Sequence, residues 1–336
     1  MKALRASSVA LTLISIRGLL IAHLEHFVPD IFTLPSRDGS VFRCSDIFVR
    51  KFLKRALGWT MRRSTRAGQK TPTNADVILT NAFLRAAYVV KHEDIHSALI
   101  ANSDQTQVTL QQGCNMTYAP TGSKQVVTVG SEEKRAITVL VTLTNDGVVL
   151  PFQTIYKGST AGSRPSQNSR SMAEALGAGF LFESSKTSTY WSTQETMRNF
   201  VNTILSPYFE NVKVKLGLPH QQCSLWFIDC WSVHRSDEFL SWMAVTHITI
   251  IVLFVPAGCT GLFQACDVGF QRIFKHSLKI SAHSDVVQEV LAQLKAGVEV
   301  SDVKIDTSLG VLRDRTVHWL WTAFETLNKP ETVKKV

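Results

Sequence analysis

Two β-prone runs joined by a tight-turn sequence constrain the fold of this chain most. Residues 136–144 and 148–156 are rich in Val, Leu, Ile and Thr, and Asn145, Asp146 and Gly147 lie between them. Asp-Gly is a preferred connection between antiparallel strands, because both central turn positions must tolerate positive φ. β-branched residues favour the pleated backbone on either side. The sequence therefore predicts an antiparallel hairpin near the middle of the chain.

Shorter apolar runs on either side of the hairpin predict further strands, separated by helices. Residues 98–101, 224–228 and 247–255 have the length and composition of buried strands. Helices are predicted after the capping box at 192–195, where Pro207 ends the helix, from Ser236 through Trp242, and over 269–280. The order is strand, hairpin, helix, strand, helix, strand, helix. This order predicts an α/β fold that is RNase H-like, a mixed sheet with helices on both faces.

Three aspartates lie at the ends of predicted strands or just before a predicted helix. Asp104 comes at or just past the end of the strand at 98–101, Asp229 directly follows residues 224–228, and Asp267 precedes the last helix. Carboxylates on rigid elements can hold the two divalent cations of phosphoryl transfer, and Mg²⁺ accepts such ligands. By position alone, an aspartate after a strand is more often a solvated turn or a helix cap. Six cysteines without a Cys-x-x-Cys pair argue against zinc.

Most of the net charge of +9 comes from one segment. Between residues 47 and 75 there are eight basic residues and no acidic one: Arg50, Lys51, Lys54, Arg55, Arg62, Arg63, Arg66 and Lys70. Apolar residues from Ser45 to Trp59 recur at helical spacing, and Gly58 stands where a helix C-cap is expected. A solvated helix face is one interpretation. The absence of any acid favours contact with nucleic acid phosphates.

The sequence around the three aspartates resembles the DDE superfamily endonuclease domain of mariner/pogo-like transposases. The first block is Asn102-Ser-Asp-Gln-Thr106, where that family has Asn-x-Asp-(Glu/Gln)-Thr. In the second block Asp229 ends a hydrophobic strand and is followed by Trp231 and His234. The third block runs from Pro256 through Gln264 to Asp267. The resemblance covers roughly residues 98–285 and is specific, because three separated blocks match in order.

The resemblance implies a DNA-binding DDE-type endonuclease/transposase that cleaves and transfers DNA strands with Mg²⁺ or Mn²⁺. It implies that Asp104, Asp229 and Asp267 are the catalytic and metal-binding residues. His234 and Gln264 are accessory candidates, and a structural role for His234 is equally open. Arg272 and Lys275 are candidates for DNA contact on the last helix, and a solvated face is the alternative. We expect DNA as partner, no membrane and a nuclear location, and a homodimer is left open.

The segment from Ser45 to Pro72 resembles the last helix and tail of the helix-turn-helix arm of centromere protein B-like sequences. The expected regions are a helical N-terminal region (1–45), a basic helix-turn-helix-like remnant and linker (46–96), the RNase H-like DDE endonuclease domain (97–285) and a C-terminal helical tail (286–336). The part of the sequence upstream of the endonuclease domain is too short for the usual pair of helix-turn-helix units. In addition, Ala265 replaces the usual proline after Gln264, which predicts a looser turn before Asp267.

Two other interpretations stay open. A non-catalytic, host-retained DNA-binding protein derived from a transposase is the main rival, because of Ala265 and the short arm. A secreted or membrane protein rests only on the apolar run at 9–16, which faintly resembles a signal peptide and is better explained as a helix that becomes buried. No apolar run reaches the roughly eighteen residues of a membrane span.

Overall fold

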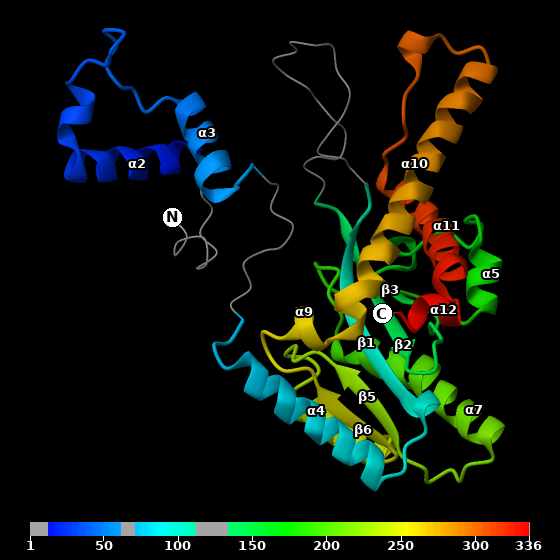
Figure 1. Cartoon of the computed structure of the whole chain (residues 1–336). Coiled ribbons are helices and arrows are strands. Elements are labelled where there is room, and N and C mark those ends of the chain that lie inside the picture. Colours follow the sequence, from blue (N-terminus) through cyan, green and yellow to red (C-terminus); the bar gives the residue numbers. More distant parts are fainter. Residues whose placement is uncertain (1–12, 62–70, 112–133, 336) are drawn as a thin grey trace. The chain divides into compact units, whose positions relative to one another are not determined.

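The computed structural model describes residues 13–61, 71–111 and 134–335 (Figure 1). The chain forms two compact units, residues 1–70 and residues 71–336, and each is described by itself. Across the described ranges, no helix combines the length and the apolar character that a membrane crossing requires.

The smaller unit is helical. It contains α2 (Leu13–Phe27), a 3₁₀ turn η1 (Pro29–Phe32) and α3 (Asp46–Leu57) around a small core of Ile16, Leu20, Cys44 and Val49. The Ser45 hydroxyl accepts the Phe48 N–H at 3.2 Å, which caps the start of α3. Gly58 ends the helix with φ +66°, in the left-handed region that glycine enters without strain. The helix and the C-cap predicted from the sequence are confirmed.

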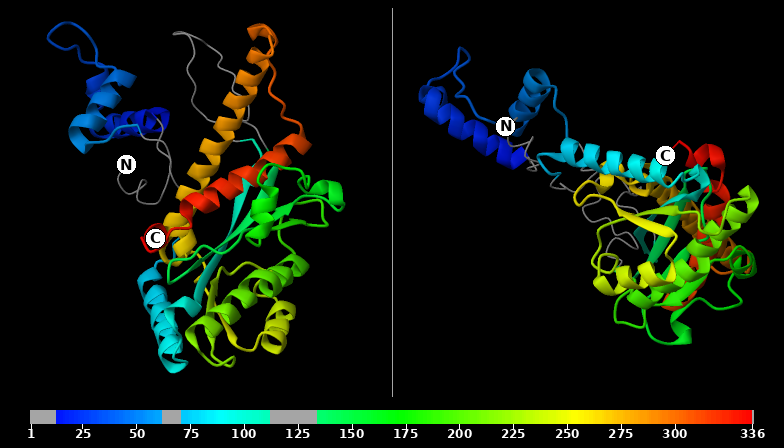
Figure 2. Two further views of the ribbon diagram at one scale, coloured as in Figure 1. Left: turned by 90° about the vertical axis from the view of Figure 1, so that its right-hand side faces the viewer. Right: turned by 90° about the horizontal axis from the view of Figure 1, so that it is seen from below.

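The larger unit is built on one mixed sheet with the strand order β4-β3-β2-β1-β5-β6. Its strands are β1 (Ile100–Thr109), β2 (Ala136–Thr144), β3 (Gln153–Tyr156), β4 (Leu181–Ser184), β5 (Ser224–Ile228) and β6 (Ile250–Phe254). β1, β2 and β3 are antiparallel neighbours, whereas β5 is parallel to both β1 and β6. Helices cover both faces (Figure 2). The predicted RNase H-like α/β fold is confirmed.

The helical segments of this unit follow in chain order. They are α4 (Ala75–His92), η2 (Ser97–Leu99), η3 (Ala161–Ser163), α5 (Met172–Gly177), α6 (Gln194–Phe200), η4 (Val201–Leu205), α7 (Ser206–Leu216), α8 (Asp237–Thr246), α9 (Thr260–Phe263), η5 (Cys266–Phe270), α10 (Gln271–Lys295), η6 (Val300–Asp302), α11 (Leu309–Leu327) and α12 (Pro330–Val333). η4 and η5 are π-helical turns. α10 extends well past the end of the sheet (Figure 1).

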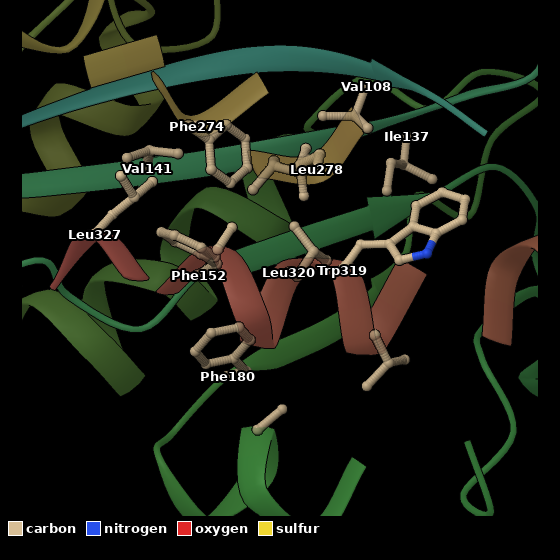
Figure 3. Packing of buried hydrophobic residues seen from close by; sticks show 14 of the residues in the cluster. Val108, Ile137, Val141, Phe152, Phe180, Phe274, Leu278, Trp319, Leu320 and Leu327 are labelled. Carbon is tan, nitrogen blue, oxygen red and sulfur yellow. The ribbon is translucent and has the colours of Figure 1, made fainter. Parts of the chain in front are cut away.

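Two hydrophobic cores hold the sheet between its helices. On one face, β1 and β2 pack against α10 and α11, as Figure 3 shows for Val141, Phe274 and Leu320. On the other face, Trp226 of β5 packs against Phe200 and Phe239, with ring centroids 6.1 and 6.3 Å apart. Each fully buried side chain of this size contributes about 1.5–3 kcal/mol relative to an exposed one. α11, in the region expected to be a C-terminal tail, is therefore an integral part of the core.

Several local predictions were wrong in their boundaries. The strand predicted at 98–101 begins at Ile100 and runs to Thr109, because it pairs with β2 over nine residues, a long-range contact that the local pattern does not reveal. The second hairpin strand was predicted from 148, but β3 starts at Gln153. Val149 makes only an isolated bridge with Leu143, and Pro151 has no N–H to continue the ladder.

The helix predicted to end at Pro207 instead continues from α6 through η4 into α7. Pro207 lies in the first turn of α7, directly after the π-helical turn. A proline removes one N–H donor from a helix, and here it does so where the hydrogen-bond register already shifts. The N-cap of α6 is Thr193, one residue later than predicted, and its capping box pairs it with Thr196.

The hairpin turn generates a test of backbone strain. Gly147 has φ +101°, and an added Cβ would lie 3.1 Å from the backbone Cα of Pro330 in α12. Gly217 also has positive φ, +65°, but faces open space. We expect Gly217→Ala to lower the free energy of unfolding by about 1 kcal/mol and Gly147→Ala to lower it clearly more. Urea unfolding of both variants measures this, and equal losses of stability would contradict it.

Candidate active site

The pairing of β1 with β5 brings two of the three aspartates level with each other. Asn102 of β1 is in parallel register with Phe227 of β5. Continuing that register by two residues sets Asp104 beside Asp229, on strands that lie about 4.8 Å apart. Asp104 lies in the middle of β1, opposite Val141 of β2, and Asp229 is the first residue after β5.

Asp267 lies in η5, the π-helical turn that leads into α10, and β1 holds that turn in place. The Cys266 N–H donates to Asn102 Oδ1 at 3.1 Å, and the buried Gln264 amide donates from Nε2 to the Ser103 carbonyl at 2.9 Å. Both acceptors directly precede Asp104 in the chain. Gln264 thus anchors the third block to β1 from inside the core.

Ala265 does not loosen this turn. Its φ is −53°, within the narrow range that a proline ring imposes. Gln264 before it is extended, with ψ 112°, as residues before proline usually are. The backbone therefore already has the conformation that a proline would fix, and the looser turn expected from the sequence is not found.

The three carboxyl groups are close enough to act on one another. Burial raises the pKa of Asp104 to about 8, and the negative charges of Asp267 and Asp229, together with a hydrogen bond to Asp267, contribute to that rise. The side chain of Asp104 is buried. Like charges in one buried site disfavour each other's ionised form. Within the described ranges, however, no group of three or more His, Cys, Asp or Glu side chains is arranged to hold a metal ion.

Protein side chains engage two of the three carboxyl groups. Gln271 of α10 donates from Nε2 to Asp104 Oδ2, and Thr106 donates its hydroxyl to Gln271 Oε1 at 3.0 Å. Sequence reasoning missed Gln271. Its position four residues after Asp267, on the same helix face, is the signal that could have revealed it.

Lys275 lies one further turn along that face of α10. Partial burial lowers the pKa of Lys275, and the negative charges of Asp104 and Asp267 oppose that lowering. Lys275 is therefore within electrostatic range of two of the three acids. Arg272 is exposed on the same helix.

His234 contacts protein groups through both ring nitrogens. Nδ1 lies 2.7 Å from Asp229 Oδ1, and Nε2 lies 3.3 Å from the side-chain nitrogen of Gln105. The imidazole is 1% exposed and packs edge-on against Trp231, with ring centroids 5.3 Å apart. A ring enclosed in this way cannot reach a phosphate without leaving its partners. The geometry therefore favours the structural interpretation that the sequence left open, with Asp229 as the group that His234 holds.

The basic segment is only partly described. Arg50, Lys51, Lys54 and Arg55 are exposed on α3, on the side away from buried Val49. Arg62, Arg63, Arg66 and Lys70 lie outside the described residues. These cations belong to the smaller unit, so their position relative to the three acids is not defined.

Comparison with known proteins identifies a family. Residues 134–329 match the DDE superfamily endonuclease family. This range contains Asp229 and Asp267, and Asp104 lies upstream of it. The match also extends beyond residue 285, through α11, in agreement with the core that α11 helps to form. A search of curated proteins found no match.

Several solved structures are distantly similar. The Mos1 transposase paired-end complex with left transposon end has a TM-score of 0.43 and 11% identity, over 93% of this chain and 79% of that one. The Mos1 mariner paired-end complex with Mn gives 0.43 and 11%, over 92% and 76%. A pre-cleavage Mos1 transpososome gives 0.42 and 10%, over 92% and 77%. At these values the likeness says nothing about the chemistry of this chain.

The raised pKa of Asp104 predicts a pH-dependent stability in metal-free protein. Its carboxyl titrates near 4 when unfolded and near 8 when folded. The protonated group therefore stabilises the fold fully below about pH 4, and that contribution is lost as the pH rises through about 8. The Asp104→Asn variant has no carboxyl group at this position, so its stability lacks this dependence on pH. Wild-type stability relative to this variant should fall by on the order of a few kcal/mol between about pH 5 and pH 9.

Urea unfolding in the presence of a chelator, repeated across that pH range, measures the difference in free energy of unfolding between wild type and Asp104→Asn. Asp302→Asn, at an exposed aspartate in η6, is the control, and its difference from wild type should not depend on pH. A pH-independent difference for Asp104→Asn would show that the carboxyl is not held in its protonated form.

Proposed function

Since the chain belongs to the DDE superfamily endonuclease family, we propose that it is a metal-dependent DNA endonuclease of the transposase type, which cleaves and transfers DNA strands. The family match spans residues 134–329, more than half of the 336-residue chain. The observation that carries the proposal is the meeting of three carboxyl groups from β1, the residue after β5, and η5, where burial and the charges of Asp267 and Asp229 raise the pKa of Asp104. A cluster of like charges destabilises a fold, and carboxyl groups whose pKa is shifted in this way are concentrated at functional sites.

We propose that Asp104, Asp229 and Asp267 hold Mg²⁺ or Mn²⁺. The donor set fits these ions, because carboxylate oxygens are the ligands that hard divalent cations take. The electrostatic state of the site also fits, since a bound cation would offset the burial and the like-charge repulsion that together raise the pKa of Asp104. Gln271 and His234 each engage one carboxylate oxygen, of Asp104 and Asp229 respectively.

The roles of the chain's own groups follow from their positions. When bound, the divalent ion would supply Lewis-acid polarisation of the phosphate and activation of the attacking hydroxyl. Asp104, Asp229 and Asp267 are presented by a strand, a strand end and a helix start, so the framework limits their movement. Lys275 adds positive charge beside acids that would otherwise repel DNA phosphates, and Arg272 extends that charge along α10.

We further propose that the basic segment binds DNA. On α3 the exposed Arg50, Lys51, Lys54 and Arg55 are opposite the apolar core of the smaller unit, so they are available to phosphates. The tail that follows adds Arg62, Arg63, Arg66 and Lys70. Binding to phosphates in this way gives affinity without sequence specificity.

One observation favours a second candidate function. Among the described residues, the side chains as they stand form no group able to hold a metal ion. A host-retained DNA-binding protein derived from a transposase, without catalysis, would have this property. The two functions make different predictions about DNA cleavage by the wild-type protein.

The first test of the endonuclease is Asp229→Asn. The amide keeps the shape of the carboxylate and can still accept from His234, so the fold should survive. It removes a negative charge that would hold the cation. Nicking of supercoiled plasmid with Mn²⁺ should fall by more than the roughly 100-fold that removal of an outer-shell partner typically costs. DNA binding should be unchanged or slightly stronger, because one repulsive charge is removed.

Asp302→Asn is again the matched control and should nick like wild type. If wild type and Asp229→Asn nick equally well, Asp229 is not a ligand. If neither nicks while both bind DNA, the non-catalytic function is correct.

The second test concerns the basic helix. Replacing Arg50, Lys51, Lys54 and Arg55 together by Gln should weaken non-specific DNA binding. It should also reduce the slope of log affinity against log salt by about 0.9 for each DNA phosphate that the protein no longer neutralises. Gln at four exposed lysines elsewhere (Lys91, Lys215, Lys329 and Lys335) changes the net charge equally. Equal effects of the two quadruple variants in a salt titration would mean that overall charge, not this helix, determines binding.

A further inference from the structure

A chain of hydrogen bonds leads from the interior of the larger unit to Asp229. The Ser192 hydroxyl donates to Gln105 Oε1 at 2.9 Å, and Gln105 Nε2 lies 3.3 Å from His234 Nε2. His234 Nδ1 then lies 2.7 Å from Asp229 Oδ1. Gln105 directly follows Asp104 in β1, and successive side chains of a strand point to opposite faces. One strand thus presents Asp104 to α10 and Gln105 to His234.

The orientation of the Gln105 amide is determined by its neighbours. Nε2 also lies 3.3 Å from Met197 Sδ, and a thioether sulfur only accepts hydrogen bonds. The Ser192 hydroxyl is the neighbour that donates to the amide oxygen. Reversing the amide would turn its oxygen toward the sulfur, one acceptor against another, whereas the Ser192 hydroxyl could then accept from the NH₂ group. The contact with Met197 therefore favours the orientation in which the NH₂ group faces His234.

This orientation fixes the position of the proton on His234. An amide NH₂ group only donates, so Nε2 of the imidazole must accept. The neutral ring then carries its proton on Nδ1, and Nδ1–H donates to Asp229 Oδ1. Trp231 and Phe239 pack against the ring, with centroids 5.3 and 6.4 Å away. The ring is thereby held in one plane as well as in one tautomer.

We propose that Gln105 is a positioning residue, which holds His234 in its Nδ1–H tautomer so that His234 orients the carboxylate of Asp229. This inference rests on the proposed function, in which Asp229 is a metal ligand. Asp229 needs such support because it follows the end of β5 and its side chain is 30% exposed. Without a fixed donor its carboxylate could rotate away from Asp104 and Asp267. Such outer partners set the orientation of ligands in metal sites.

The decisive variant is Gln105→Glu. It conserves size but presents only acceptors to His234, so the ring must place a proton on Nε2. The ring then either loses its proton on Nδ1 and with it the donor to Asp229, or becomes an imidazolium that pairs with the charge Asp229 would use to hold the cation. Gln107→Glu is the matched control, because Gln107 lies on the same strand, two residues further along, and is exposed. In Mn²⁺-dependent nicking of supercoiled plasmid, Gln105→Glu should lower kcat about 10- to 100-fold. KM for the plasmid should not change, and the control should keep the wild-type kcat.

Gln105→Met separates hydrogen bonding from charge. It is neutral and of similar length but cannot donate, so it should lower kcat in the same direction as Gln105→Glu. Ser192→Ala offers a milder perturbation that keeps Gln105 itself. It releases the amide oxygen, and we expect an intermediate loss of kcat. This variant tests the chain of bonds even if a substitution in β1 prevents folding.

The tautomer itself is measured on the full-length, metal-free protein. With ¹⁵N-labelled histidine, two-bond ¹H–¹⁵N correlations distinguish Nδ1–H from Nε2–H, and His234→Gln identifies the signal. Wild type should show Nδ1–H, and Gln105→Glu should show a proton on Nε2. A merely structural role for Gln105 would not move this signal.

The outcomes distinguish this inference from the function on which it rests. A wild-type ring protonated at Nε2 alone contradicts the inference, whatever the activity. So does a tautomer that changes in Gln105→Glu while kcat stays at the wild-type value. A wild type that never nicks DNA contradicts the endonuclease, and the tautomer then decides by itself whether the hydrogen-bond chain exists.

Discussion

The position of β1 between β2 and β5 is the constraint on which the rest of the larger unit depends. Nine residues of β1 pair with β2, and its first three pair in parallel with β5. The antiparallel ladder makes β1 rigid through Asp104, and the parallel register brings Asp229 level with it. η5 is then tied to Asn102 and Ser103 of the same strand. A single strand thus positions all three acids. Displacing β1 would therefore move all three apart at once.

Local signals in the sequence predicted the parts of this arrangement that depend on neighbouring residues. Residues within a few positions of one another are enough to predict three of these parts. They are the Asp146-Gly147 turn, the Gly58 cap and the buried run before Asp229. The site differs, because its contacts join residues far apart in the chain. Gln271 and Asp104 are 167 positions apart, and Gln105 and His234 are 129 apart. Periodicity carries no information about such pairs. No role was therefore predicted for Gln105, although it lies inside the first block, or for Gln271, which lies four residues after Asp267.

The same reason explains the boundary errors. Residues 102–107 of β1 are mostly polar, so their pattern does not indicate a buried strand, and pairing with β2 imposes the extended backbone. Pro207 locally predicts a helix end, but the π-helical η4 and the core packing of Phe200 and Phe209 carry the helix across it. In both places tertiary contacts outweigh local propensity.

The hydrogen-bond partners of the acids show how the site accommodates the repulsion between three carboxyl groups. Asp104 bonds to the neutral amide of Gln271, and Asp229 bonds to His234, which the proposed hydrogen-bond chain holds as a neutral donor. Arginine partners would neutralise the carboxylates and compete with a metal ion, whereas neutral donors orient them and leave their charge uncompensated. Burial, and then the charges of Asp267 and Asp229, raise the pKa of Asp104 in this arrangement. Lys275, on the helix that begins at the third acid, moderates the repulsion from a distance without a direct ion pair to these acids among the described contacts. A protein that needed only a stable fold would gain by replacing these groups with apolar ones. The presence of two further acids beside the buried Asp104 is intelligible if the missing positive charge comes from a ligand.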